Sequence, residues 1–323
     1  MTISAIVPVW NGRDLLARLL ATLAAQTVPA TEILVVDNGS TDGTPQLARE
    51  RGARVMAMGR NAGFAAAVNR GIREARGEWI AVLNSDVELA PDYFEKLTAS
   101  GAAFATGKIL SKTGATLDGS FDLVCRGGTA WRAGSGRADH PIFAETRQIA
   151  SPPWTAVLFR ADAFARTGLL EESFESYLED VDFGLRCAAL GMEGQYVPGA
   201  VAWHLGSATL GRWHPETVRR IARNQVWLVA RHFPAGLLWP ILVAQLLWGA
   251  VALRHGTGWA WLRGKCQGIA GFRKMRAGSA RIESAFLQEW LAENERQIRR
   301  IQKATGFDTY WRLYFFLSRG GAK

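Results

Sequence analysis

The sequence predicts an α/β fold in which helices flank a mostly parallel central sheet. Four short apolar runs in the first ninety residues are each followed by turn-forming, amide or acidic residues, and helical periodicity separates them. This alternation is typical of parallel strand–helix–strand units. Because ligands of such sheets bind outside the carboxyl ends of the strands, the residues after each run are candidate binding residues. A length of 323 residues with 48% hydrophobic content allows one large core plus an appended region.

The first two elements of this pattern define the start of the sheet. Residues 3–12 form an apolar run closed by Pro8, Asn11 and Gly12, which predicts a buried strand entering a loop. Helical spacing follows at Leu15, Leu16, Leu19, Leu20 and Leu23. A second run, 33–36, ends directly at Asp37, which therefore stands where a parallel sheet would meet a nucleotide.

The third and fourth runs also end in polar residues. A short strand is predicted over 53–58, and a helix rich in small residues over 61–71. Either a phosphate binds at the N-terminus of this helix, near Gly63, or the helix is only tightly packed. The strand 79–83 is followed by Asn84, Ser85 and Asp86. Hard oxygen ligands suit Mg²⁺ or Mn²⁺ held against a diphosphate, and the alternative for Asp86 is an ordinary turn residue.

A dense acidic motif comes next, at Glu179, Asp180 and Asp182, and Trp203–His204 follows it. Neighbouring carboxylates repel one another and resist desolvation unless a cation or a proton transfer uses them. The alternative is a solvated helix N-terminus, where acids favour the helix dipole. For His204 the alternative to a metal ligand is a buried histidine at a strand end.

The order of these motifs resembles that of the family 2 glycosyltransferases, which are inverting enzymes with the GT-A nucleotide-sugar fold. Within them it is most similar to the rhamnosyltransferase-like subgroup of bacterial polysaccharide assembly. The similarity runs from about Ile3 to His204 and is specific only in combination. The sequence departs from the family's acid-x-acid pattern at Asn84, which replaces the first acid. We therefore expect the metal ion to bind less tightly when the nucleotide-sugar donor is absent.

The resemblance assigns roles to individual residues. It implies that the nucleotide sugar contacts Pro8, Trp10, Asp37, Asn61, Gly63, Asn69, Asn84 and Ser85. It implies that Asp86 and His204 bind Mg²⁺ or Mn²⁺, that Asp180 is the general base, and that Glu179 faces the acceptor. Trp154 either offers a ring face to an acceptor sugar or belongs to the core. Asp182 is expected to fix the loop or helix terminus.

These roles predict transfer of a sugar from a nucleotide donor to a membrane-linked glycan. The expected donor is dTDP-rhamnose first and a UDP-sugar next, and the expected acceptor is a saccharide on a polyprenyl diphosphate. One rival function is a nucleotidyltransferase, which needs a basic group near the first loop, where Arg13 is the near candidate. The other rival is a catalytically inactive nucleotide-sugar-binding protein.

The charge of the chain changes after His204. Residues 205–323 carry 19 Lys and Arg against 6 Asp and Glu, a net charge of +13, whereas residues 1–204 carry a net charge of −4. Nine of the 13 tryptophans also lie after residue 200. The sequence therefore predicts a catalytic domain over 1–210 and a helical, membrane-associating region over 211–323, which binds an anionic membrane surface. No nucleic-acid motif accompanies the positive charge.

Residues 235–253 carry no formal charge and would reach roughly 28 Å as a helix, close to the thickness of a bilayer core. A helix lying in the interface is favoured over a single crossing, and a core helix is the alternative. An amphipathic helix over 281–304 could pack on the catalytic domain or pair two chains, and 311–317 could be a further anchor. The N-terminus enters a strand at once and leaves no room for a signal peptide. We therefore expect the catalytic domain to lie at the cytoplasmic face of the inner membrane.

Overall fold

The computed structural model describes residues 1–205, 213–279 and 281–318, and its chain divides into two compact units. Unit 1 contains Met1–Asp122 and Gly134–Gly206, and unit 2 contains Leu123–Ala133 and Ser207–Lys323. The short segment 123–133 thus joins the C-terminal helices, although the sequence prediction placed it in the catalytic domain.

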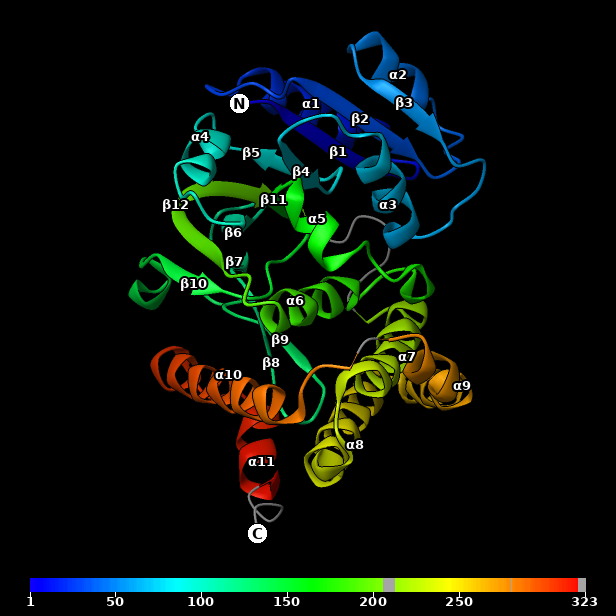
Figure 1. The fold of residues 1–323 in the computed structure, drawn as a ribbon, viewed down its shortest axis with the longest axis vertical. Helices are drawn as coiled ribbons and strands as arrows, with labels where there is room; N and C mark the ends of the chain where they lie inside the picture. Colours follow the sequence, from blue (N-terminus) through cyan, green and yellow to red (C-terminus); the bar gives the residue numbers. More distant parts are fainter. Residues whose placement is uncertain (206–212, 280, 319–323) are drawn as a thin grey trace. The chain divides into compact units, whose positions relative to one another are not determined.

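Unit 1 is built on one mixed sheet (Figure 1). Its strands are β1 (Ile3–Val9), β2 (Glu32–Asp37), β3 (Arg54–Ala57), β4 (Trp79–Leu83), β5 (Val87–Leu89), β6 (Phe104–Ser111), β7 (Leu117–Gly119), β10 (Arg147–Ile149), β11 (Ala156–Arg160) and β12 (Gly194–His204). Its helices are α1 (Arg13–Ala24), α2 (Thr44–Glu50), α3 (Phe64–Glu74), α4 (Tyr93–Thr98), α5 (Asp162–Thr167) and α6 (Glu179–Ala189).

The strand order is β10-β12-β6-β11-β4-β1-β2-β3, with β5 paired to β12 and β7 paired to β6. The first half of the sequence forms the parallel block β4-β1-β2-β3. In the second half β11 runs antiparallel to both β4 and β6, whereas β12 is parallel to β6. The predicted α/β class is confirmed, and the mostly parallel arrangement holds for the block that the four apolar runs build.

The core of unit 1 follows from the apolar patterns. Every residue of β1 is buried, and α1 buries Leu16, Leu19, Leu20 and Leu23, the face that its helical spacing predicts. Helix α3 packs on β1 through small residues, since a Cβ at Gly71 would collide with the side chain of Ile6. Close packing on both faces fixes the direction of each strand, and hence the position of the polar residues that follow it.

Unit 2 is mainly helical. Its elements are the hairpin of β8 (Asp122–Val124) and β9 (Ala130–Arg132), and the helices α7 (Pro215–His232), α8 (Leu238–Arg254), α9 (Gly258–Ala277), α10 (Ser284–Thr305) and α11 (Thr309–Leu317). The helices predicted over 235–253 and 281–304 are thereby confirmed as α8 and α10.

A buried carboxylate anchors the hairpin to these helices. Glu295 of α10 accepts a hydrogen bond from the backbone N–H of Arg126 and pairs with its guanidinium group at 2.9 Å. The hydroxyl group of Tyr314 on α11 donates to the same carboxylate at 2.6 Å. Three separate segments of unit 2 therefore meet at Glu295, which explains why 123–133 belongs with the C-terminal helices.

Candidate functional site

The polar residues after β1, β2 and β4 meet at one edge of the sheet, as predicted. The register pairs Val9 with Asp37, and the backbone N–H of Asn11 donates to the Ser40 hydroxyl group across the two loops. On the other side of β1, the side chain of Ser85 lies next to Gly12. The candidate nucleoside residues are therefore neighbours in space because the strands that carry them are neighbours in the sheet.

The predicted nucleoside residues differ in their exposure. Pro8 is buried within β1, whereas the Trp10 side chain directly after the strand is 41% exposed and can offer a ring face. Asp37 is 4% exposed, and its carboxylate accepts from the backbone N–H of Ser40 at 3.1 Å. A carboxylate has about four acceptor positions, so this bond leaves Asp37 able to accept from a ligand.

A shallow hollow of about 320 Å³ lies in front of the first loop and is lined by residues 11–15 and Asp42. The backbone N–H of Arg13 donates to the Asp42 carboxylate at 3.1 Å. Burial acts to raise the pKa of Asp42, but hydrogen bonds from Thr44 and from the Arg13 backbone outweigh it and lower the pKa. The hollow is therefore lined by an acid with a lowered pKa, Asp42, and by the basic residue Arg13.

The N-terminus of α3 is occupied by the chain itself. The backbone N–H of Ala65 donates to the carbonyl of Glu175 at 2.9 Å, and a Cβ at Gly63 would lie 2.9 Å from the same carbonyl oxygen. Gly63 also has φ +89°, which favours glycine. These contacts favour the tightly packed helix over the phosphate site that the sequence left open. For Asn61, whose side-chain oxygen accepts from the Gly63 N–H, the nucleotide contact stays a prediction.

Asn69 has a different task from the predicted one. Its side-chain amide donates to the carbonyl of Leu170 and to the Glu172 carboxylate, both at 2.9 Å, and its oxygen accepts from the Leu170 N–H at 3.0 Å. The residue is only 1% exposed. Because these bonds use both ends of the amide, Asn69 fixes the segment before α6 instead of contacting a nucleotide.

Asp86 and His204 lie side by side, 118 positions apart in the sequence. Strand β5 pairs antiparallel with the end of β12, which places His204 opposite Val87, and the Leu205 N–H donates to the Asp86 carbonyl. The Nε2 atom of His204 lies 3.1 Å from the Asp86 carboxylate. The sheet therefore brings together the two residues that the sequence predicts as metal ligands.

A third residue, Asp118 on β7, completes this cluster. One of its carboxylate oxygens lies 3.1 Å from the Nδ1 atom of His204. Burial acts to lower the pKa of His204, but Asp118 and Asp86 outweigh it and raise the pKa to about 9. Sequence reasoning missed Asp118, because a single aspartate between leucine and glycine carries no pattern that distinguishes it from a turn residue.

The side-chain oxygen and nitrogen atoms of this cluster are suitable ligands for a divalent cation. Adjacent ligands of an octahedral ion with bonds of about 2.1 Å lie about 3 Å apart, close to the separation of His204 Nε2 and the Asp86 oxygen. Within residues 1–205, 213–279 and 281–318, no group of three or more His, Cys, Asp and Glu is arranged to hold a metal ion. Two protein ligands are nevertheless ordinary for Mg²⁺, which takes further ligands from water and substrate phosphates.

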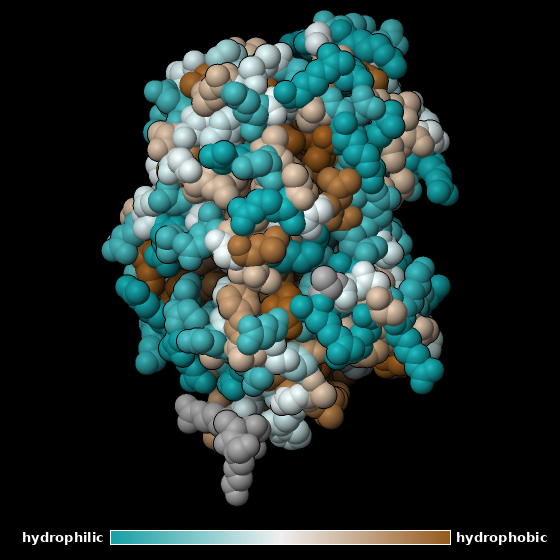
Figure 2. All heavy atoms as spheres, in the orientation of Figure 1, coloured by the Kyte–Doolittle hydropathy of each residue, from teal (hydrophilic) through white to brown (hydrophobic). Residues whose placement is uncertain are grey.

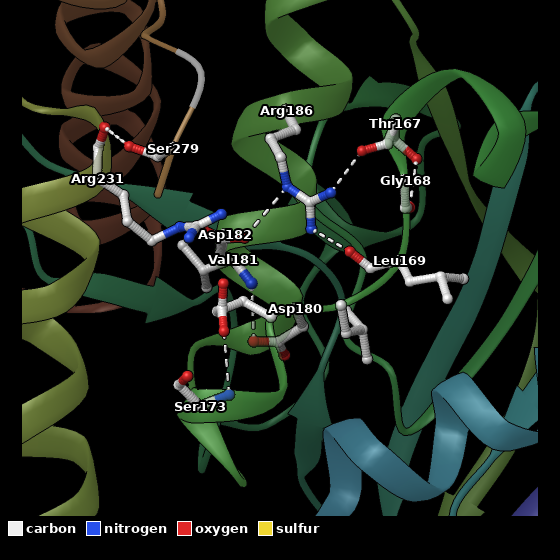
Figure 3. A network of polar contacts seen from close by, with 12 residues as sticks. Thr167, Gly168, Leu169, Ser173, Asp180, Val181, Asp182, Arg186, Arg231 and Ser279 are labelled. Atoms are coloured by element: carbon white, nitrogen blue, oxygen red, sulfur yellow. Dashed lines mark hydrogen bonds and ion pairs between the residues drawn. The ribbon is translucent and has the colours of Figure 1, made fainter. Parts of the chain in front are cut away.

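Asp180 lies in the first turn of α6, behind a strained loop (Figure 3). Its carboxylate accepts from the N–H of Val181 at 2.8 Å. Glu175, Tyr177 and Leu178 all have φ between +61° and +72°, which is costly for residues with side chains. Strain of this kind persists only where the surrounding structure imposes it, and it often marks functional loops. Glu179, beside Asp180, is 5% exposed.

Asp182 anchors α6, as the sequence predicts. Its fully buried carboxylate pairs with Arg186 at 3.1 Å one turn along the helix. The same guanidinium group donates to the carbonyls of Thr167 and Leu169, at 2.5 and 2.9 Å (Figure 3). This clamp joins α6 to the segment before it and so sets the position of the helix that carries Asp180.

Trp154 belongs to an aromatic cluster. Its side chain is 3% exposed, and its ring centre lies 4.9 Å from Phe159 and 5.0 Å from Phe183. Phe164 packs against the same rings. The ring faces are used within the core, which favours the core alternative over stacking with an acceptor sugar.

Unit 2 carries most of the large exposed hydrophobic residues of the chain. On α8 these are Leu238, Trp239, Leu242, Leu246 and Leu253, on α9 they are Trp259, Leu262 and Ile269, and on α11 they are Leu313, Phe316 and Leu317. The indole N–H of Trp239 donates to the carbonyl of Leu317 at 3.0 Å, so the exposed sides of α8 and α11 adjoin. On the face seen in Figure 2, hydrophobic atoms form small separate areas among hydrophilic ones.

One helical stretch of the described residues, Ala235–Arg254, is long and apolar enough to cross a membrane. Its mean hydropathy is 1.9, and 33% of it is buried. A single helix of this kind is weak support for a membrane span, because core helices have the same length and composition.

Comparison with known proteins identifies the family. Residues 4–106 match the model of "Glycosyl transferase family 2". The chain is 31% identical over 226 residues to an N-acetylglucosaminyl-diphospho-decaprenol L-rhamnosyltransferase of Mycobacterium tuberculosis, which covers 61% of this chain and 74% of the relative. It is 36% identical over 114 residues to the succinoglycan biosynthesis protein ExoO of Rhizobium meliloti, covering 33% of each chain.

Two solved structures share the fold at low sequence identity. A structure of GalNAc-T7 with UDP, GalNAc and Mn²⁺ aligns with a TM-score of 0.65 at 14% identity, over 92% of this chain and 58% of that one. The mannosyltransferase PcManGT from Pyrobaculum calidifontis, solved with GDP-Man and Mn²⁺, aligns with a TM-score of 0.53 at 16% identity, over 99% of this chain and 88% of that one. These likenesses confirm the predicted GT-A fold. The rhamnosyltransferase match, with the family model over residues 4–106, shows that the chain belongs to glycosyltransferase family 2.

Proposed function

We propose that this protein is a metal-dependent, inverting glycosyltransferase that transfers a sugar from a dTDP- or UDP-linked donor to a hydroxyl group of a lipid-linked glycan. The observation that carries the proposal is the 3.1 Å approach of His204 to Asp86 at the carboxyl edge of the sheet. Rhamnose is the first candidate sugar, because the relative with 74% coverage is named as an L-rhamnosyltransferase acting on a decaprenyl diphosphate-linked sugar.

The donor site is assigned to the strand ends of unit 1. Trp10 and Asp37 contact the nucleoside, with Pro8 supporting them from β1. Asn61, Asn84 and Ser85 surround the diphosphate, whereas Gly63 packs against Glu175 and only shapes the loop that carries Asn61. Asp86 and His204 would hold Mg²⁺ or Mn²⁺, which would supply positive charge to stabilise the leaving diphosphate.

The proton transfer is assigned to Asp180. Its carboxylate accepts the proton of the acceptor hydroxyl group as the oxygen attacks the anomeric carbon. The bond between that carbon and the diphosphate oxygen breaks on the opposite face, so one displacement inverts the anomeric centre and releases the nucleoside diphosphate. Glu179, its neighbour, is assigned to the acceptor side. The Asp182–Arg186 clamp keeps the helix in position during this step.

Unit 2 is proposed to bind the anionic surface of the inner membrane on its cytoplasmic side. Exposed leucine, tryptophan and phenylalanine side chains on α8, α9 and α11 support this, as does the net charge of +13 over residues 205–323. The proposed division assigns catalysis to unit 1 and membrane association to unit 2, which includes the segment 123–133. Pairing of two chains through the C-terminal helices stays a prediction.

A donor screen tests the proposal. The purified protein is heated with dTDP-rhamnose and with a panel of UDP-sugars, each with and without Mn²⁺, and the melting temperature is recorded. A donor that raises the melting temperature only with Mn²⁺ is then incubated with a polyprenyl diphosphate-linked acceptor, and the anomeric configuration of the product is determined. Retention of configuration would contradict the proposal, and binding without any transfer would favour an inactive nucleotide-sugar-binding protein.

A further inference from the structure

The cluster at His204 contains one carboxylate to which the proposed reaction gives no role, that of Asp118. Its oxygen lies 3.1 Å from Nδ1 of His204, while Nε2 of the same ring lies 3.1 Å from Asp86. The two ring nitrogens therefore face two different acids. The side chain of Asp118 is 29% exposed, against 12% for both His204 and Asp86, so it approaches the imidazole from the more open side.

The backbone places Asp118 at this point through a β-bulge. Strands β6 and β7 pair Ile109 with Gly119 and then Leu110 with Leu117, so Asp118 is the extra residue on β7. A bulge disturbs the ladder and re-aims a side chain, and such bulges occur often beside active sites. On the other edge of β6, the parallel strand β12 sets Trp203 opposite Leu110 and His204 opposite Ser111. Strands β7 and β12 thus flank the same end of β6, with Asp118 directed at His204.

The position of β7 is also fixed from its outer side. The N–H of Leu117 donates to the carbonyl of Arg137 at 2.7 Å, and the N–H of Gly136 donates back to the carbonyl of Leu117 at 2.8 Å. The neighbouring residue Leu117 is 1% exposed. Since Leu117 is held on both edges and buried, the fold fixes the backbone next to Asp118, whose carboxylate lies 3.1 Å from Nδ1 of His204.

We infer that Asp118 is a positioning residue, which holds Nδ1 of His204 so that Nε2 is presented beside Asp86 to a divalent cation. This inference rests on the proposed metal site. A histidine that binds a metal through one nitrogen commonly donates its other N–H to a carboxylate, which fixes the tautomer and the direction of the ring. Asp118 acts through His204 and touches neither the donor nor the acceptor.

The test is Mn²⁺ affinity, measured by electron paramagnetic resonance on the full-length chain in the presence of UDP. Asp118→Ala is expected to weaken Mn²⁺ binding about 10- to 100-fold, the usual effect of losing such a partner. Asp118→Asn is expected to weaken it less, because the amide oxygen can still lie beside Nδ1 of His204, although without the negative charge. Asp139→Asn is the matched control, since Asp139 pairs with Lys108 and has no role in the proposed site; its affinity should equal that of the wild type.

Two outcomes would overturn the inference in distinguishable ways. If Asp86→Asn and His204→Ala weaken Mn²⁺ binding but Asp118→Ala does not, the metal site stands and Asp118 has no positioning role. If none of the three changes Mn²⁺ affinity, the metal assignment itself is wrong, and the inference fails with it. The affinity for UDP without Mn²⁺ is measured for every variant as a control. If Asp118→Ala and Asp118→Asn both lose this affinity to the same extent, the site has collapsed, and this result would also overturn the inference.

Discussion

The imidazole of His204 lies 3.1 Å from the carboxylate of Asp86, across the pairing of β12 with β5. Asp86 follows the fourth strand of the chain and His204 ends the last strand of the sheet. The contact therefore depends on the second, mixed half of the sheet, which places β12 beside the short strand that follows Asp86.

Replacing Asp86 should remove most of the transfer activity. We expect Asp86→Asn to lower kcat/KM at least about 100-fold, because a neutral amide is a poor ligand for a hard cation. Glu88→Gln is the control, since Glu88 lies two residues away and its nearest cation is the Arg18 guanidinium group at 3.9 Å. Initial rates at several Mn²⁺ concentrations measure the effect. Equal losses in both variants would indicate a general effect of charge near β5.

Replacing Asp182 should affect stability first. The carboxylate is fully buried and pairs with Arg186, so Asp182→Asn leaves the guanidinium group without its counter-charge. Breaking a buried pair from one side costs about 3 to 5 kcal/mol. Urea denaturation measures the free energy of unfolding. Asp162→Asn, at a pair in which both side chains are more than half exposed, should change this free energy by less than about 1 kcal/mol. A similar small change for Asp182→Asn would contradict the role of the clamp.

Lys265 should make the stability of the protein depend on pH. Burial lowers the pKa of Lys265 from 10.5 to about 7, and its ammonium group contacts only uncharged oxygens among its described partners, on Ala222, Gln225 and Gln245. Between these two pKa values the unfolded chain binds more protons than the folded chain. The contribution of Lys265 to the free energy of unfolding therefore rises with pH, by up to about 1.4 kcal/mol per unit.

Urea denaturation at pH 7 and pH 9, followed by tryptophan fluorescence, measures this dependence. The change in the free energy of unfolding from pH 7 to pH 9 should be less positive for Lys265→Met than for the wild type, since the opposing contribution of His204, whose pKa is raised to about 9, is present in both. Lys274→Met, at an exposed position on the same helix α9, should keep the wild-type change. If Lys265→Met keeps it as well, another group is responsible for the pH dependence.

Charged substitutions on unit 2 should weaken membrane binding. Leu246 on α8 and Phe316 on α11 are 64% and 72% exposed. A glutamate at either position would remove the apolar surface that the membrane is expected to cover, and its charge would be repelled by acidic lipid. We expect each to reduce binding to phosphatidylglycerol vesicles at least about tenfold in a sedimentation assay. Leu190→Glu, at an exposed leucine of unit 1, is the matched control. Wild-type sedimentation of a Leu246→Glu and Phe316→Glu double variant would contradict the membrane assignment.

The sequence predicted the parallel block well, because each strand there is a continuous apolar run with a polar stop. Leu16, Leu19, Leu20 and Leu23 of α1 are buried as their spacing indicates. The mixed half was less predictable, since β5, β7 and β10 are three residues long and their pairing depends on distant segments. The placement of 123–133 in unit 2 likewise depends on Glu295, an acid that looks solvent-facing in the sequence and is 4% exposed.

Site residues that belong to a sequence motif could be predicted. Site residues whose role depends only on a tertiary contact could not. Asp86 could be found as an acid after a strand, and His204 through the family resemblance. The resemblance also assigned Asn69 to the ligand, but its amide is used to hold Leu170. Asp118 could not be found, because its role follows from a bulge between two strands. No local pattern in the sequence records either relationship.

The proposed reaction requires Asp180 to act as the general base of the sugar transfer. The most direct measurement compares Asp180→Asn with the wild type for donor affinity, by calorimetry with the nucleotide sugar and Mn²⁺, and for transfer rate on the same preparation. We expect an unchanged donor affinity and a rate lowered about 10²- to 10⁴-fold, because the amide cannot accept the acceptor's proton. A transfer rate within a few-fold of the wild type, at unchanged donor affinity, would contradict this role of Asp180.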